Sequence, residues 1–187
     1  LGETPGAAVF LQVERETIRL HPQAQVRVDV HDFEAGLAAA YRHFDQRDGR
    51  GRLNAQRLRA ALDLHCGPFL DQLALEGSPL FDEWATLRRE QLLQRCVEGL
   101  ARLAEFHERR CEYHQARDVL QRLLRLTPWE ENAHAGLMRL LALDGQTGAA
   151  QTQYMLLRRY LREHLGVDPS AQSQALFETI RAGGTVA

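Results

Sequence analysis

The sequence predicts an all-α protein with a short β-hairpin or strand at its N-terminus. Three observations lead to this fold class. Leu, Ala, Arg and Glu, which are good helix formers, dominate the composition. Aromatic side chains make up only 7% of the chain, which argues against an all-β protein. From Asp32 onward the apolar residues recur at helical spacing, so the 187 residues are expected to form one mostly helical domain.

The first thirty residues show a different pattern, which predicts β-structure. Ala8 to Val13 reads as a short apolar strand, Arg15-Glu16 as a turn and Thr17 to Leu20 as a second strand. Val26 to Val30 alternates valine with charged residues, which is the period-2 pattern of an edge strand. Because an isolated hairpin is barely stable in water, this one is expected to pack on the helices or on a preceding domain.

The rest of the chain predicts helices joined by short turns, at about residues 32–44, 54–64, 79–109, 114–126, 128–144, 148–164 and 169–181. The expected helix starts are Ser78-Pro79, a capping box from Thr127 to Glu130, and Asp168. Gly145 and Gly166 are expected to end helices in the left-handed conformation.

A shift of 34 residues aligns two of these helix pairs: Leu103 with Leu137, Ala116 with Ala150, Leu120 with Tyr154, and Leu123 with Leu157. This is the period of tetratricopeptide repeats. The alanines are expected where two helices approach closely, and the larger residues one turn later are expected to fill the gap. The sequence therefore predicts tetratricopeptide-like antiparallel helix pairs in a compact right-handed array.

Charge and composition exclude several functions. The net charge of −2 is unlike that of a dedicated nucleic-acid binder, which usually carries a basic excess. No apolar run is long enough to cross a membrane, and no signal peptide is visible, so we expect a cytoplasmic protein. The chain has no initiator Met, and we expect it to be a fragment of a longer protein.

The sequence gives no support for catalysis. Cys66, Cys96 and Cys111 form no C-x-x-C pair and are expected to be reduced, buried thiols. His107 and His114 are separated by a predicted turn, and His134 falls at a repeat core position, so no metal site is expected. Without a catalytic motif or a phosphate-binding glycine loop, we expect no enzyme activity and no cofactor.

Six segments together resemble the bacterial transcriptional activator domain of Streptomyces antibiotic regulatory proteins. They are Val28 to Phe33, Leu64 to Leu70, Glu83 to Arg88, Leu126 to His134, Leu137 to Leu141 with Gly145, and Leu165 to Ser170. The resemblance covers about residues 26 to 182 and is specific in order and spacing.

The resemblance implies a layout and a function. Residues 1–30 resemble the end of an OmpR-type winged-helix DNA-binding domain, residues 31–182 the tetratricopeptide-like activator domain, and residues 183–187 are expected to be a disordered tail. The implied function is regulatory, through self-association as a homodimer or through contacts to the DNA-binding domain or RNA polymerase. DNA is then bound only through the missing N-terminal domain. The alternative is a free-standing tetratricopeptide adaptor that binds peptides.

The sequence predicts two candidate sites, and each also has an interpretation in which it binds nothing. The tetratricopeptide register predicts an interaction groove lined by Glu98, Glu105, Arg109, Asn132 and Arg139, or else an internal surface. An arginine cluster predicts a phosphate or anion patch, or else a solvated face: Arg47, Arg50, Arg52, Arg57 and Arg59, with Arg42 beside them. Trp84 and Trp129 are expected to lie in the core rather than at a partner surface.

Overall fold

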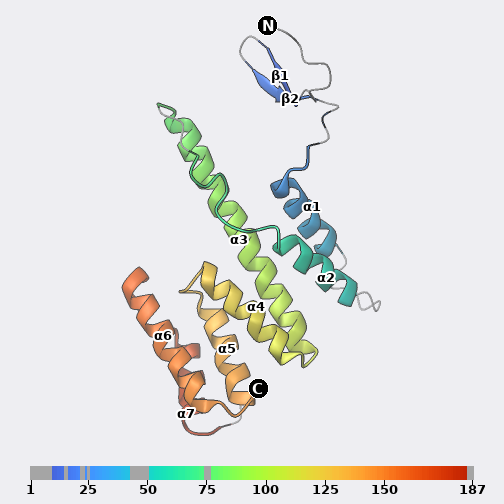
Figure 1. Cartoon of the computed structure of the whole chain (residues 1–187). Helices are drawn as coiled ribbons and strands as arrows, with labels where there is room; N and C mark the ends of the chain where they lie inside the picture. Colours follow the sequence, from blue (N-terminus) through green and yellow to red (C-terminus); the bar gives the residue numbers. More distant parts are fainter. Residues whose placement is uncertain are drawn as a thin grey trace.

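The computed structural model describes residues 10–14, 17–21, 24, 26–42, 51–73 and 77–184. Within them, two short strands precede seven α-helices (Figure 1). The strands are β1 (Leu11–Val13) and β2 (Ile18–Leu20), and the helices are α1 (Asp29–Tyr41), α2 (Gly51–Leu62), α3 (Pro79–Arg109), α4 (Tyr113–Leu126), α5 (Glu131–Leu143), α6 (Thr147–Leu165) and α7 (Ala171–Arg181). The prediction of a mostly helical chain is confirmed.

The N-terminal region contains the largest departure from the sequence prediction. β1 and β2 pair antiparallel, with Gln12 opposite Arg19, whereas the predicted turn Arg15-Glu16 lies outside the described residues. The predicted edge strand from Val26 to Val30 is wrong, because α1 begins at Asp29. The helix is favoured there by two acidic residues in its first turn, Asp29 and Asp32, which interact well with the positive end of the helix dipole.

Consecutive helices pack against each other in pairs: α1 with α2, α3 with α4, and α5 with α6. α4 also packs on α5, and α7 covers α5 and α6 (Figure 1). The connections from α3 to α6 span only a few residues, so these neighbours run antiparallel. One apolar core runs through α1 to α5. A second, smaller cluster joins Met138, Ala150, Tyr154 and Ile180 of α5, α6 and α7.

The two ends of the long helix α3 differ in how much of their surface is covered by other helices. Its C-terminal half carries the buried residues Cys96, Leu100 and Leu103, which face the neighbouring helices. Its N-terminal end extends beyond the other helices (Figure 1), and the segment before it runs back along this end. Arg89 fixes that segment by donating hydrogen bonds to the carbonyls of Phe69 at 2.7 Å and Leu70 at 3.0 Å.

Neither tryptophan lies in the core, which corrects the sequence prediction. Trp84 is 50% exposed and Trp129 is 39% exposed. Trp84 belongs to the extended end of α3, where its ring contacts those of Phe69 and Phe81, both at 5.6 Å between centroids. Trp129 lies in the turn before α5 and contacts the ring of His164. Both side chains sit where the helix pairs end, so too few neighbours remain to bury them.

Three predicted helix ends are confirmed. Ser78 is the N-cap residue of α3 and Pro79 its first residue, although the Ser78 side chain makes no capping hydrogen bond. Gly145 follows α5 with φ +72°, and Gly166 ends α6 with φ +67°. Glycine takes this left-handed backbone without the steric cost that a Cβ would bring.

Two other predicted helix starts are wrong. The capping box is absent, because the Thr127 hydroxyl donates to the carbonyl of Leu123 in α4 and Glu130 is the N-cap residue of α5. The last helix is capped by Ser170, whose hydroxyl accepts from the Ser173 backbone N–H. Asp168 instead accepts a hydrogen bond from the Arg162 side chain of α6, which draws it away from the helix start.

The residues aligned by the 34-residue shift are all buried. Ala116 and Ala150 are completely buried on α4 and α6. The larger partners are buried as well, as expected for residues that fill the space between helices: Leu103, Leu137, Leu120, Tyr154, Leu123 and Leu157. The repeat pattern therefore identified core positions of both helix pairs correctly.

Candidate functional site

A hollow with a volume of about 580 Å³ lies between α1, the segment 63–70 and α3. Its lining is mainly apolar and includes Phe33, Leu64 and Leu92. His65 contacts Phe33 here, and burial lowers the pKa of its imidazole. Within the described part of the chain, His65 Nδ1 has no hydrogen-bond partner. This nitrogen is itself closed off from solvent, so it offers no accessible group to a ligand.

The five predicted groove residues lie on α3 and α5, but most of them make local contacts. Glu105 and Arg109 pair with each other along α3 at 2.6 Å, and Glu98 accepts from Gln94 one turn earlier. Arg139 of α5 forms an ion pair with a different helix, to Glu108 of α3 at 3.7 Å. Asn132 donates to Glu130 at the start of α5. A peptide-binding role for this face stays a prediction.

The predicted anion patch is divided. Arg47 and Arg50 lie outside the described residues, whereas Arg57 and Arg59 are exposed on α2. Arg52 forms a 3.2 Å ion pair with Glu112, at the turn between α3 and α4.

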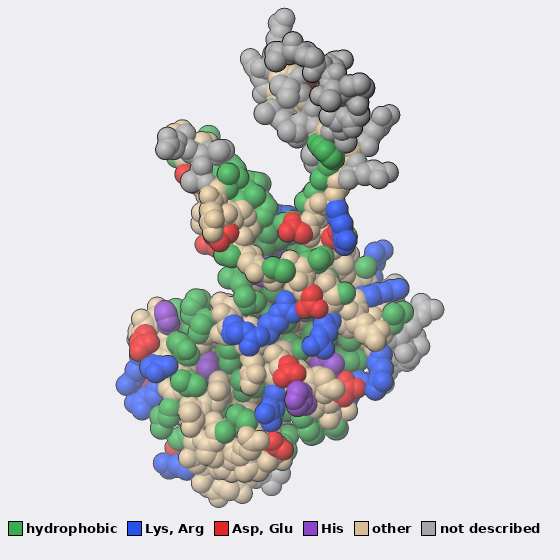
Figure 2. All heavy atoms as spheres, in the orientation of Figure 1, with side chains coloured by type: hydrophobic (Ala, Val, Ile, Leu, Met, Phe, Trp, Pro, Cys, Tyr) green, Lys and Arg blue, Asp and Glu red, His purple; other side chains and the backbone are tan. Residues whose placement is uncertain are grey.

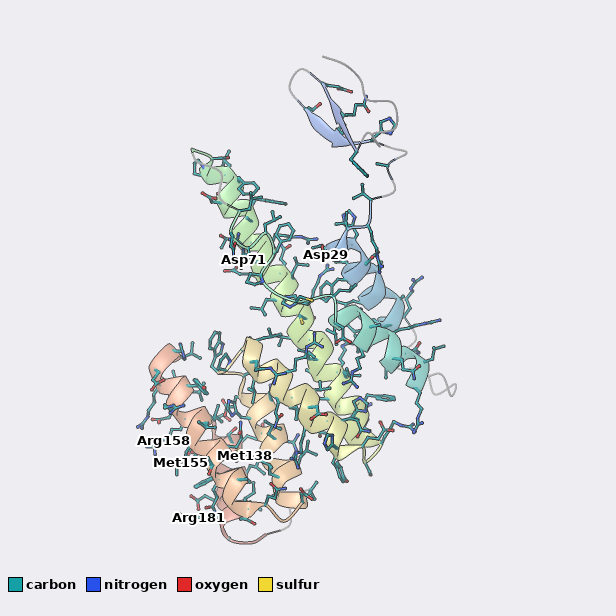
Figure 3. All side chains as sticks on the ribbon, in the orientation of Figure 1. Asp29, Asp71, Met138, Met155, Arg158 and Arg181 are labelled. Atoms are coloured by element: carbon teal, nitrogen blue, oxygen red, sulfur yellow. The ribbon has the colours of Figure 1, made fainter. Side chains whose placement is uncertain are left out.

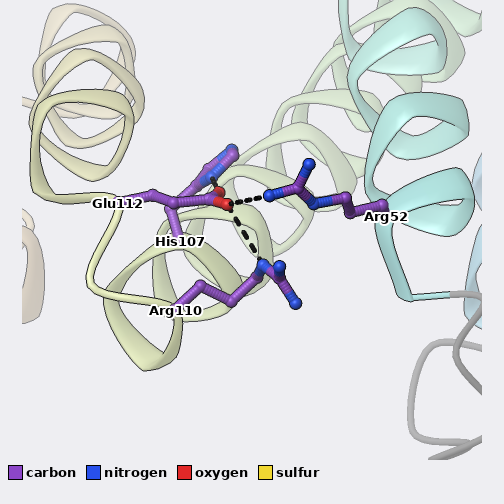
Figure 4. Close-up of polar contacts among 4 residues, drawn as sticks. All are labelled: Arg52, His107, Arg110 and Glu112. Carbon is purple, nitrogen blue, oxygen red and sulfur yellow. Dashed lines mark hydrogen bonds and ion pairs between the residues drawn. The ribbon is translucent and has the colours of Figure 1, made fainter.

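Glu112 also accepts hydrogen bonds from His107 Nδ1 at 2.7 Å and from Arg110 Nε at 3.1 Å (Figure 4). These bonds, that of His107 first, lower the pKa of the Glu112 carboxyl group. The cluster therefore ties α2 to the α3–α4 turn, and it neutralises Arg52, one of the cations assigned to anion binding.

The cysteines and histidines are only partly as predicted. Cys96 is buried, and burial raises its thiol pKa to about 11, but Cys66 and Cys111 are exposed, so the prediction of three buried thiols is wrong. Both exposed cysteines lie in connections between helices, which the core does not cover. His107 and His114 contact different carboxylates, as expected for residues on separate helices.

Two other kinds of feature are absent from the described residues. In the described ranges, no group of three or more His, Cys, Asp or Glu side chains is placed to hold a metal ion. Over the same residues, every helix is too short or too polar to span a membrane.

The most prominent surface feature is an apolar stripe on the extended end of α3, formed by Leu80, Trp84 and Leu87. These side chains are 78%, 50% and 52% exposed. Their spacing at i, i+4 and i+7 places them on one face of the helix. Figure 2 shows hydrophobic side chains gathered along this end. The same spacing is visible in the sequence, but there it is indistinguishable from a stripe that faces the core.

Carboxylates accompany this stripe. Asp82, Glu83 and Glu90 are exposed on the same part of α3, and Asp71 lies in the segment beside it (Figure 3). None of the four forms an ion pair with another described residue. Arg88, in contrast, pairs with Glu34 of α1 at 2.7 Å. The stripe is therefore an apolar surface in an acidic surrounding.

A comparison with known protein families matches the helical part of the chain. The sequence model of the bacterial transcriptional activator domain matches residues 28–181. The match begins just before α1 and ends with α7, so it includes all the described helices. No curated protein that was compared matches the chain. Because the matched region is most of the sequence, the chain belongs to the family of bacterial transcriptional activator domains.

Proposed function

We propose that this chain is the protein-contacting, regulatory part of a transcriptional activator of the Streptomyces antibiotic regulatory protein type. Its contacts are self-association as a homodimer, docking on its own DNA-binding domain, or binding to RNA polymerase. The family match to residues 28–181 supports a role in transcription. A bacterial transcription factor works beside the chromosome, so the proposal places the protein in the cytoplasm.

The apolar stripe of α3 is the observation that carries the protein-contact part of this proposal. Leu80, Trp84 and Leu87 expose large side chains side by side, although burying such a side chain typically stabilises a protein by about 1.5–3 kcal/mol. Contiguous exposed apolar surface of this kind usually marks a protein contact. Tryptophan is also among the residues that contribute most to binding at interfaces.

The proposal includes a tetratricopeptide-like pairing of α3 with α4 and of α5 with α6. The burial of Ala116 and Ala150, 34 residues apart on α4 and α6, supports this interpretation. Helix pairs of this type serve mainly as scaffolds for protein contacts. The proposal assigns the chain no catalytic role, because its sequence carries no catalytic motif.

DNA binding belongs, in this proposal, to an OmpR-type winged-helix domain before residue 1. The antiparallel pair β1 and β2 is interpreted as the final hairpin of that domain. The coding sequence upstream of Leu1 tests this part directly. About 80 residues with helix-turn-helix periodicity are expected there. A start codon close to Leu1 would instead favour a free-standing adaptor.

The contact role is tested by Trp84→Glu in the full-length activator, with a transcriptional reporter and a DNA-binding assay. The substitution places a charge in the stripe and is expected to reduce activation about fivefold or more, because 1 kcal/mol of lost contact corresponds to about that factor. DNA affinity and the circular dichroism spectrum are expected to stay unchanged. Size-exclusion chromatography with light scattering shows whether the lost contact is self-association.

Met155→Glu is the matched control. Met155 is 52% exposed on α6, away from the stripe (Figure 3), so a charge there adds the same polarity without touching α3. Full activation by the Met155 variant is expected. Equal activation by the Trp84 variant and the wild type would overturn the role of the stripe.

A further inference from the structure

A second hollow lies on a different part of the molecule, between α4 and α6. α5 lies between these two helices in Figure 1 and forms the floor of the hollow, whose volume is about 320 Å³. Leu137 and Leu141 contribute apolar surface from α5, and Leu124 and Leu156 from the two walls. We call this the α4–α6 groove. The residues of the predicted peptide groove do not line it.

Buried hydrogen bonds fix one wall of the groove. His134 is 1% exposed, and its Nε2 lies 2.9 Å from the carbonyl oxygen of Pro128. A carbonyl only accepts, so Nε2 carries the proton. In the neutral ring Nδ1 then accepts from Gln153 Nε2, at 2.6 Å. Burial lowers the pKa of His134, in keeping with a neutral ring. Gln153 is thus held in position at the edge of the groove.

The charge of the groove is positive. Arg117 and Arg125 line it from α4, and its lining contains no Asp or Glu. Arg117 pairs with Asp144 at 3.2 Å, but Arg125 has no ion pair with any described residue and is exposed. A further cation lies beside the opposite wall, because the Arg159 guanidinium is 5.4 Å from the ring centroid of Tyr160. An apolar floor is therefore combined with unneutralised positive charge at the edges.

We infer that the α4–α6 groove binds a segment of a partner protein in which acidic side chains flank a large apolar one. The apolar side chain occupies the space above Leu137 and Leu141, and a carboxylate pairs with Arg125. The Gln121 and Gln153 amides are placed to bond the main chain of such a segment. A nucleic acid fits less well, since phosphates need many cations and gain nothing from a leucine floor.

This inference rests on the proposed function, because it specifies one of the protein contacts of the domain. It concerns a different surface from the stripe of α3. The stripe is apolar and has carboxylates around it, whereas the groove is apolar and has arginines at its edges. The two surfaces therefore select partners of opposite charge, and each can fail without the other.

The test is selection from a displayed library of random twelve-residue peptides on the immobilised chain. Enriched peptides are expected to combine Asp or Glu with Leu, Phe or Trp. Their affinities are then measured by fluorescence anisotropy on the wild type and on Arg125→Gln, Leu156→Asp and Arg102→Gln. Arg102 of α3 is also an exposed helical arginine without an ion pair to a described residue, and it lies outside both the groove and the arginine cluster of α2, so it controls for lost charge alone.

Arg125→Gln is expected to weaken binding about two- to fivefold, and Leu156→Asp to abolish it, whereas Arg102→Gln leaves it unchanged. Circular dichroism checks that each variant is folded. The inference is overturned if no acidic peptides are enriched, or if Arg125→Gln and Arg102→Gln weaken binding equally. Peptides whose binding depends on Trp84 but not on Arg125 would overturn the groove and leave the proposed contact role standing.

Discussion

His134 shows how a single residue connects folding with the surface. The sequence predicts a core position for it, and the structure places it in the core between the α4–α5 turn and α6. Its protonation state was not predictable, because it depends on Pro128 and Gln153, which lie 6 and 19 residues away along the chain. These two contacts require a neutral ring, since a protonated Nδ1 has no lone pair to accept from Gln153.

A pH dependence of stability follows from this geometry. Burial lowers the pKa of His134 in the folded protein, whereas in the unfolded chain it titrates near pH 6.5. Below that pH the unfolded state binds more protons than the folded state, so the free energy of unfolding falls as the pH is lowered. Urea unfolding at pH 7.5 and 5.5 measures this loss.

His134→Gln is expected to reduce the pH dependence, because glutamine offers a donor to Pro128 and does not titrate. Part of the dependence remains, since burial also lowers the pKa of His65. Glu112 and Glu131, whose pKa values are lowered, affect stability only at more acidic pH. If wild type and variant lose equal stability between the two pH values, His134 is not the titrating group.

At the scale of the helices, periodicity predicted the elements better than their ends. The helix at about residues 79–109 was predicted correctly, because a long apolar pattern identifies a helix and Ser78-Pro79 its start. The capping box at Thr127 failed because its hydroxyl has an alternative acceptor in the preceding helix, at Leu123. A capping side chain can bond either to its own helix or to a carbonyl of the preceding helix, and the sequence does not show which of these bonds is formed.

Close approach of α1 and α2 provides a test of helix packing. A Cβ on Gly36 would lie 2.7 Å from the Cβ of Ala61, which no rotation of a side chain relieves. Gly36→Ala therefore forces the helices apart. We expect it to lower stability by up to about 2 kcal/mol, since overpacking typically costs about 1–3 kcal/mol and the helix-propensity gain of about 1 kcal/mol offsets part of that cost.

Gly148→Ala is the matched control for chemical denaturation experiments. Gly148 lies near the start of α6, and a Cβ there would meet no heavy atom within 4 Å. Only the helix-propensity term remains, so a gain of up to about 1 kcal/mol is expected. A loss of stability at both positions would show that close helix packing is not the cause at Gly36.

For the molecule as a whole, the sequence predicted the helical class and much of the core, but not the two surfaces that are proposed to contact partners. The stripe Leu80, Trp84 and Leu87 has the spacing of a core face, and only the extension of α3 beyond its neighbours exposes it. The α4–α6 groove unites Arg125 with Gln153 from separate helices, a placement that no sequence spacing gives. Surfaces arise from how helices end and cross, which is a tertiary property.

The distribution of charge leads to a last prediction, that this chain alone binds DNA weakly and without sequence preference. Its net charge of −2 gives no overall attraction to phosphates. On α2, Arg52 is paired with Glu112, and Arg57 and Arg59 are the cations left exposed among the described residues of the predicted patch. Each neutralised phosphate adds roughly one unit to the slope of log affinity against log salt. A few contacts are therefore lost near physiological salt.

Fluorescence anisotropy with a promoter duplex and a random duplex, each at low and physiological salt, measures this binding. Similar weak affinities are expected for both duplexes at low salt, with a shallow salt slope and little binding at physiological salt. Arg57→Gln and Arg59→Gln are expected to reduce the slope, because they remove the exposed arginines of α2 that form no ion pair with a described residue. Tight binding at physiological salt that distinguishes the two duplexes would contradict the prediction. Sequence recognition would then reside in the helical domain itself, and the proposed winged helix would no longer be needed to explain promoter selection.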